Sequence, residues 1–296
     1  MTNQDFNIES KKYIDDVYSE FCEYQRLVWN IFVWFNHFCK KHEIQYFMGF
    51  GSLIGVIRDK GCIPWDYDID VIVKINEKDK LIQLLELELP DSMYYTYSTN
   101  VEEYPTCCLR ICQKGFPFTS IHLDVYFLIG NPKKEPQNFV DNIENYHILR
   151  EIKYGDKWYP QEFSNDKKNL KLQLLRLYRE FRKITISANK IKFFEERILK
   201  QYPLGSSPFC SIHGDPYRKV YFIEDFSSTL KIHINGEDVT IPVGYDRYLS
   251  IIYKDYKNYL PISTRFDEFY RMTINVRKRI NYMKSDDTGK FDFCKK

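Results

Sequence analysis

The N-terminal part of the chain carries one apolar stripe. Apolar side chains recur there at alternating steps of three and four residues, which is the spacing of one face of an α-helix. The pattern predicts a long helix over residues 10–41 and favours core packing over a cofactor groove as the role of its aromatic residues. The stripe consists of Ile14, Val17, Phe21, Tyr24, Val28, Ile31, Phe35 and Phe38.

Shorter apolar runs follow, separated by turn-forming residues. Charged and apolar residues alternate over residues 68–73, as they do in a half-buried strand. The other predicted elements of this part are a strand at 45–50, a Gly-Ser turn leading into a short helix that ends at Arg58, a helix at 77–87, and strands at 107–112 and 121–128.

The C-terminal half is expected to be helical with short strands. Residues 167–200 predict one or two helices and carry eleven Lys or Arg against three Glu, a net charge of 11 − 3 = +8. This charge favours a solvated helical face, with contact to an anionic acceptor as the alternative. Short strands are expected at 219–223, 229–234 and 238–241, then a helix after Pro242 that reaches Tyr253, a basic and partly helical tail at 271–284, and disorder at 285–296.

Composition narrows the class of protein. The chain has 296 residues, of which 44% are hydrophobic and 17% aromatic, so one large folded domain, alone or with a small appendage, is expected. The net charge of +2 argues against a dedicated nucleic-acid binder. The eight cysteines form no CxxC pair, which indicates reduced thiols. We expect a cytoplasmic protein, because no signal peptide or membrane-spanning run is seen, with peripheral contact of the basic tail at the inner membrane face as an alternative to an ordinary surface helix.

Three aspartates stand at alternate positions before and within a predicted strand. If the strand begins early enough, Asp66, Asp68 and Asp70 share one face, because side chains two residues apart point the same way. Like charges that close are unfavourable unless a cation lies among them. Oxygen donors of this kind suit Mg²⁺ or Mn²⁺, which could neutralise phosphate oxygens during phosphoryl transfer. The alternative is a solvated edge or turn, against which the apolar residues at 69 and 71–73 argue.

Two further features support a phosphate site. Gly51 and Ser52 form a small pair at a predicted helix start, where backbone N–H groups and the helix dipole favour an anion. Arg58 is either a phosphate ligand or a surface arginine. Asp124 lies within an otherwise apolar strand, where a carboxylate is costly unless it is paired or binds a metal. A solvent-facing strand position shared with His122 and Tyr126 is the alternative for Asp124.

At these residues the sequence resembles the LicD family, which includes bacterial phosphocholine transferases, fukutin and fukutin-related protein. The matching segments are Gly-Ser-Leu-Ile-Gly-Val-Ile-Arg over 51–58 and Gly-Cys-Ile-Pro-Trp-Asp-Tyr-Asp-Ile-Asp over 61–70. Weaker similarity is found around Asp124 and over residues 241–256. Tyr67 replaces the middle aspartate of the family's acidic run, and Lys254 replaces a glycine. Tyr67 is expected to point away from the aspartates.

The resemblance implies an α+β fold of the nucleotidyltransferase (DNA polymerase β-like) type, a mixed sheet with flanking helices and a helical C-terminal part. It further implies metal-dependent transfer of a phosphorylated alcohol from a CDP-linked donor to a glycan hydroxyl, with release of CMP. Phosphocholine is expected first, then ribitol phosphate or glycerol phosphate, in capsule, teichoic acid, lipopolysaccharide or protein-linked glycans. Asp68 and Asp70 would hold the metal with help from Asp66, and Asp124 would complete the metal site or accept the acceptor's proton.

Two alternatives stay open from the sequence. The same carboxylates would serve a nucleotidyltransferase that moves NMP from an NTP and releases pyrophosphate, and a non-catalytic relative could bind a nucleotide without turnover. The expected organisation is an N-terminal helical segment at 1–44, a catalytic core at 45–135, a C-terminal part at 136–284 that completes the site, and the tail at 285–296.

Overall fold

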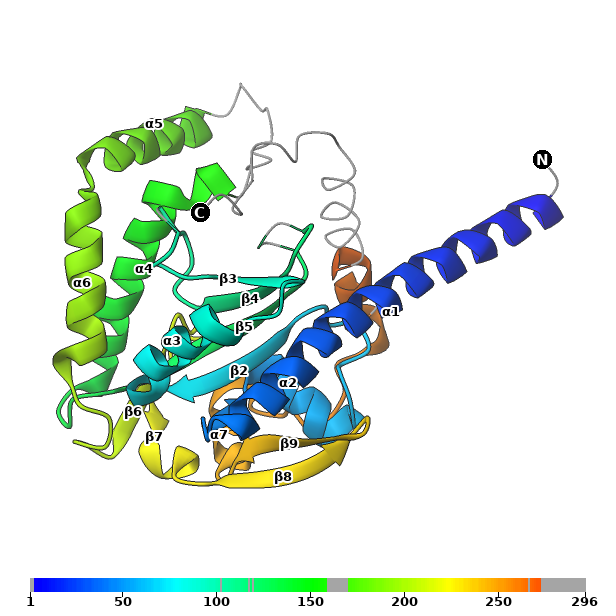
Figure 1. Ribbon diagram of the computed structural model, residues 1–296. Helices are drawn as coiled ribbons and strands as arrows, with labels where there is room; N and C mark the ends of the chain where they lie inside the picture. Colours follow the sequence, from blue (N-terminus) through cyan, green and yellow to red (C-terminus); the bar gives the residue numbers. More distant parts are fainter. Residues whose placement is uncertain are drawn as a thin grey trace.

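The computed structural model describes residues 3–101, 103–116, 118, 120–158, 170–265 and 267–272. A mixed sheet occupies the centre, with helices on its sides (Figure 1). Its main path runs in the order β1-β2-β5-β4-β3, and β6 pairs with β5 and with β7. The parallel pair β2–β5 lies in the middle, while the other pairings are antiparallel. This arrangement confirms the predicted α+β class with a nucleotidyltransferase-like mixed sheet.

The strands of this sheet are short and mostly buried. Apolar side chains on both faces, rather than strict alternation, explain why the central strands have almost no exposed positions. Their bounds are β1 Tyr46–Met48, β2 Ile69–Lys74, β3 Met93–Thr96, β4 Leu109–Gln113, β5 His122–Gly130, β6 Phe209–His213 and β7 Tyr221–Phe222.

A second, two-stranded sheet packs beside β1. Its strands are β8 Thr229–Ile234 and β9 Glu237–Pro242, joined by Asn235 and Gly236, which both have positive φ as a tight hairpin requires. The Thr240 hydroxyl donates a hydrogen bond to the Tyr46 carbonyl at 2.7 Å and ties the hairpin to β1.

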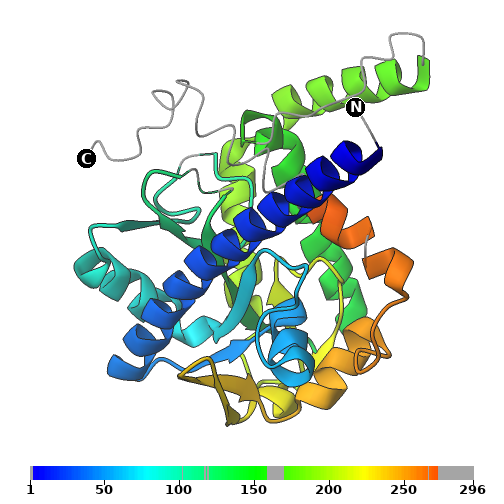
Figure 2. The same ribbon diagram turned by 90° about the vertical axis from the view of Figure 1, so that its right-hand side faces the viewer.

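The predicted N-terminal helix is confirmed and longer than expected. Helix α1 spans Asn3–Lys41 and crosses one side of the molecule (Figure 2). From Phe21 onward its stripe is buried against the sheet, since Val28, Ile31 and Phe35 are all at most 1% exposed. The positions of the stripe before Phe21 fall where side chains are not described.

The remaining helices surround the sheet. Residues 167–200, predicted as one or two helices, hold two, α5 and α6, and both contact α4. Helix α6 runs alongside α4, whereas α5 lies across the top of the view in Figure 1. Helix α4 and strands β3 and β6 had no counterpart among the predicted elements. The predicted tail at 271–296 lies almost wholly outside the described residues. The bounds are α2 Phe50–Ile54, α3 Lys78–Glu88, α4 Pro136–Trp158, α5 Leu170–Thr185, α6 Ala188–Gln201 and α7 Tyr245–Tyr253.

Helix α2 continues directly into a π-helical turn, Gly55–Asp59, and so extends to the Arg58 region as predicted. In the described part of the chain, no helix combines the length and the apolar character that crossing a membrane requires. The seven cysteines described are free thiols.

Candidate active site

The centre of the candidate site is the parallel strand pair β2–β5. Asp70 on β2 is the direct partner of Asp124 on β5, so both carboxylates leave the sheet on the same face. Asp124 is only 4% exposed, which excludes the solvent-facing strand position considered for it. Asp70 is half-buried at the start of its strand.

The condition under which Asp66, Asp68 and Asp70 would share one face of a strand is not met, because β2 begins only at Ile69. The Asp66 N–H donates to the Ile63 carbonyl at 3.0 Å and closes a turn after Pro64. The Gln25 side chain of α1 donates to the Ile63 and Asp66 carbonyls at 3.0 and 2.6 Å. It thus satisfies backbone acceptors that a neighbouring strand would otherwise pair with. Asp66 closes this turn, and Asp68 follows it just before β2.

The four aspartates, Asp66, Asp68, Asp70 and Asp124, form one acidic group. Asp66 and Asp68 line the same small pocket as Ser52, whose hydroxyl binds the Asp70 N–H. Burial, and then the charge of Asp68, raise the pKa of Asp66 well above its usual value. Burial raises the pKa of Asp70 as well, and Asp68, Asp124 and Asp66 raise it further. Carboxyl groups that raise one another's pKa values in this way form an oxygen-rich site of the kind that suits Mg²⁺ or Mn²⁺. In the described part of the chain, however, no three of them bring ligand atoms within 4.8 Å of one another.

Asp124 differs from the other aspartates because it has a cation beside it. The Arg110 Nε donates to Asp124 Oδ1 at 2.7 Å, and His122 Nε2 lies 3.5 Å from Oδ2. Burial works to raise the pKa of Asp124, but Arg110 and then His122 outweigh it and hold the pKa below its usual range. A carboxylate held ionised in this way is a weak proton acceptor at neutral pH, which favours an electrostatic role over that of a general base.

Sequence reasoning missed Arg110, although a signal was present. Arg110 is the single charged residue in a run of buried strand residues on β4, and it is the direct partner of Asp124 across β4–β5. A lone charge in each of two apolar strands indicates that the strands are neighbours and that the charges pair. The Cys108 thiol adds a hydrogen bond to Asp124 Oδ1 at 3.4 Å.

The Gly51–Ser52 pair lies next to Asp66 and Asp70. A Cβ on Gly51 would come within 2.8 Å of Asp66 Oδ2, so only glycine lets that carboxylate approach the first turn of α2. The Ser52 hydroxyl accepts a hydrogen bond from the Asp70 N–H at 2.8 Å and fixes the start of β2. The predicted contact of this pair with phosphate stays a prediction.

Arg58 is not an ordinary surface arginine. Its guanidinium lies 4.4 Å from the Tyr259 ring centroid and 6.0 Å from that of Trp65, and its Nη2 is 2.9 Å from Asp59 Oδ2. Only 12% of the Arg58 side chain is exposed. The arginine therefore joins the π-helical turn to the C-terminal segment and stands beside the Trp65–Asp66 turn. Phosphate binding by Arg58 stays a prediction.

An aromatic group borders the aspartates on the side of α7. The rings of Phe50 and Tyr217 stack with centroids 5.9 Å apart, and the ring of Tyr253 meets Tyr217 edge-on at 5.1 Å. The two tyrosine hydroxyls lie 2.9 Å apart. The Gly49 N–H, one residue before Phe50, donates to the Asp70 carbonyl at 2.9 Å, which places these rings near Asp70. Burial raises the pKa of Tyr217, and Asp70 is among the charges that raise it further.

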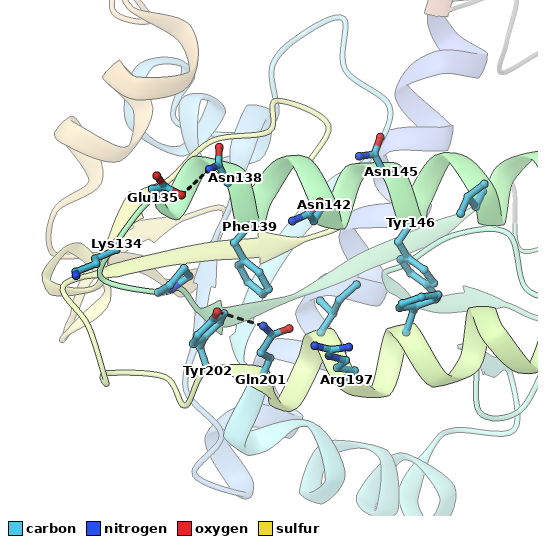
Figure 3. Close-up of a pocket in the computed structure, with 14 residues that line it drawn as sticks. Lys134, Glu135, Asn138, Phe139, Asn142, Asn145, Tyr146, Arg197, Gln201 and Tyr202 are labelled. Atoms are coloured by element: carbon cyan, nitrogen blue, oxygen red, sulfur yellow. Dashed lines mark hydrogen bonds between the residues drawn. The ribbon is translucent and has the colours of Figure 1, made fainter.

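A separate cavity of about 480 Å³ lies between α4 and α6. Phe139 and Tyr146 of α4 point toward Arg197 and Gln201 of α6 across it (Figure 3). None of the four aspartates lines this cavity, so its size alone does not make it the reactive centre.

Comparison with known proteins agrees with this geometry. Residues 43–158 match the family described as "LicD/FKTN/FKRP, nucleotidyltransferase domain". The chain is 23% identical to the lipopolysaccharide cholinephosphotransferase LicD of Haemophilus influenzae, over 81% of this chain and 92% of the relative. It is 28% identical to the uncharacterized protein RP689 of Rickettsia prowazekii, over 39% of this chain and 42% of the relative. The matched residues 43–158 include all four aspartates.

Proposed function

Because the chain belongs to the LicD family of phosphotransferases, we propose that it transfers a phosphorylated alcohol from a CDP-linked donor to a glycan hydroxyl and releases CMP. The observation that carries this proposal is the pairing of Asp70 with Asp124 on β2 and β5, with Asp66 and Asp68 beside them. Four carboxylates in one partly buried space suit a reaction in which phosphate charge must be neutralised.

The donor atoms fit a hard divalent cation. Asp66, Asp68 and Asp70 would hold Mg²⁺ or Mn²⁺, and a bound ion would neutralise the diphosphate oxygens of the donor. Asp124, already paired with Arg110, would complete the negative side of the site and hold Arg110 in place. The lowered pKa of Asp124 argues against its acting as the base for the acceptor hydroxyl.

The proposed reaction is a displacement at one phosphorus atom. The oxygen of the acceptor hydroxyl forms a bond to the phosphorus that carries the alcohol, and the bond from that phosphorus to the bridging oxygen breaks. CMP leaves with the bridging oxygen, and the hydroxyl proton passes to a base and then to solvent. The turn at 63–68 and strand β2 hold the carboxylates around the diphosphate, so the protein contributes chiefly position and charge.

Phosphocholine is the first choice of transferred group, with ribitol phosphate and glycerol phosphate next. Tyr217 is 38% exposed and stands with Tyr253 beside the acidic group, so its ring face can meet a trimethylammonium group. The Haemophilus relative is named for cholinephosphate transfer to lipopolysaccharide, which supports phosphocholine as the transferred group and a cell-surface glycan as the acceptor here.

A CMP-release assay tests the proposal. Purified protein is incubated with CDP-choline, CDP-ribitol or CDP-glycerol, each with Mg²⁺, Mn²⁺ or EDTA and with candidate lipopolysaccharide acceptors. We expect acceptor-stimulated CMP from CDP-choline that requires the metal and disappears in Asp68→Asn. Pyrophosphate released from an NTP under the same conditions would contradict the proposal and favour nucleotidyl transfer.

A further inference from the structure

A second group of ligand-type side chains includes Cys107, the residue before Cys108. In the described part of the chain, the one set of three His, Cys, Asp or Glu side chains with ligand atoms all within 4.8 Å consists of Cys107, His147 and His213. Cys107 precedes β4, His147 lies on α4 and His213 ends β6. The set therefore joins three elements that are distant in sequence.

The neighbours of each ring indicate which nitrogen it offers. His213 Nδ1 lies 3.3 Å from the Cys107 carbonyl oxygen, and a carbonyl only accepts, so Nδ1 must carry the proton. His147 Nδ1 faces the Glu144 carboxylate at 3.7 Å. A metal-binding histidine commonly directs its second ring nitrogen to a carbonyl or a carboxylate in this way. In both rings Nε2 is then left to act as the ligand.

Both of these nitrogens are otherwise unsatisfied. His147 Nε2 and His213 Nε2 are buried and have no hydrogen-bond partner among the described residues. His213 is 0% exposed and Cys107 is 7% exposed. A buried polar atom without a partner destabilises a fold, so two such nitrogens beside a thiol indicate a missing partner that accepts lone pairs, which is a cation.

We propose that Cys107, His147 and His213 bind a zinc ion. One thiolate and two imidazole nitrogens are ligands that zinc prefers, whereas Mg²⁺ takes oxygen ligands, so this site differs chemically from the aspartates. Three protein ligands leave a fourth position for water. Glu144, which also pairs with Arg218 at 2.6 Å, orients His147 from the second coordination shell.

The zinc ion fastens α4 to the sheet next to the active site. Cys107 is followed directly by Cys108, whose thiol contacts Asp124, so fixing Cys107 also fixes one neighbour of the acidic group. Close packing supports this arrangement, because a Cβ on Gly214 would lie 3.2 Å from the Cys107 Cβ. The site is therefore expected to stabilise the fold and to position the β4 side of the carboxylates.

Elemental analysis of the untagged protein tests the proposal first. We expect about one zinc per chain after exhaustive dialysis against Mg²⁺ buffer. Removal of the zinc by a chelator under native conditions, followed by Co²⁺, should give the absorption of a thiolate-to-cobalt charge transfer. Zinc content near zero together with no such absorption on adding Co²⁺ would overturn the proposal.

Variants locate the site. Cys107→Ser and His213→Gln should lose the zinc and the cobalt absorption, whereas the matched controls Cys39→Ser and His42→Gln should keep both. Retention of full zinc and of the charge-transfer band by Cys107→Ser would contradict the assignment. If a variant does not fold, alkylation of native wild-type protein decides, since zinc should protect Cys107 and its removal should expose that thiol.

The zinc result is separable from the proposed activity. Asp70→Asn should keep one zinc while losing CMP release, because its carboxylate belongs to the other site. A protein that binds zinc at Cys107 but releases no CMP from any donor would leave the zinc site standing and refute only the phosphotransfer proposal.

Discussion

Asp70 and Asp124 are direct partners on the parallel strands β2 and β5, yet their environments shift their pKa values in opposite directions. Burial and the neighbouring aspartates raise the pKa of Asp70, whereas Arg110 and His122 hold that of Asp124 low against the effect of burial. The negative charge of Asp124 is thus compensated by neighbouring cationic groups, whereas that of Asp70 is opposed by neighbouring carboxylates.

Asp70→Asn should raise the stability of the metal-free protein and abolish its activity. The substitution removes a charge that Asp68, Asp124 and Asp66 repel, so the melting temperature in EDTA should increase. CMP release should fall on the order of 10²-fold or more, the typical cost of one preorganised electrostatic contact. Calorimetry and the CMP assay measure the two effects, and the exposed Asp91→Asn should change neither. A lower melting temperature in EDTA would show that the Asp70 charge is compensated.

Arg110→Gln should destabilise the fold in a pH-dependent way. Removing one partner of a buried ion pair costs roughly 3–5 kcal/mol. The unfolded-state pKa of an aspartate is about 3.9, and that of Asp124 is lower in the fold, so the pair stabilises fully above about pH 4 and less as the pH falls toward the folded value.

Urea unfolding of wild type and Arg110→Gln at several pH values checks this. The difference in unfolding free energy should be widest near neutral pH and should narrow in acid. Arg26→Gln, which breaks an exposed pair with Glu23, should leave the unfolding free energy nearly unchanged. A difference between wild type and Arg110→Gln that is constant with pH would refute the pairing as the cause.

Gly51→Ala should impair activity more than folding. The new methyl group would meet Asp66 Oδ2 at 2.8 Å, and this side-chain atom can move at little cost, but it would then leave the acidic group. A displacement of about 1 Å can lower turnover by up to about a hundredfold. Gly61→Ala is the matched control, because its Cβ would find only Asn235 Nδ2 at 3.7 Å. Equal CMP release by both variants would contradict the role of the close approach.

Tyr217→Ala should weaken the use of CDP-choline selectively. Loss of a cation–π contact of about 0.5–2 kcal/mol corresponds to a roughly 2- to 30-fold rise in KM. Tyr217→Phe keeps the ring and should retain most of the affinity, although it loses the hydroxyl contact with Tyr253. The exposed Tyr178→Ala serves as a control for surface effects. An equal rise in KM for CDP-choline and CDP-glycerol would show that the ring does not recognise the trimethylammonium group.

The four aspartates could be identified from the sequence, because three of them are close together in the chain and the fourth is a lone charge among apolar residues. Asp66, Asp68 and Asp70 lie in one short segment, and Asp124 interrupts an apolar strand. The backbone conformation at Asp66 and Asp68 could not be predicted from the sequence. Strand β2 begins only at Ile69, and the preceding turn is held by Gln25 of the distant helix α1. Strand boundaries depend on such distant partners, which a local pattern does not contain.

The sequence by itself determined the long helix α1 and singled out the four aspartates as candidates, since periodicity and local motifs are properties of neighbouring residues. The class of fold followed from the resemblance to the LicD family. Only the tertiary structure decided that Arg110 compensates Asp124 and that Cys107 meets His147 and His213. Cys107 and His213 are 106 residues apart, and no short sequence motif links them. The physical reason is that pairing across a sheet and packing of a helix onto it bring together side chains whose separation along the chain is arbitrary.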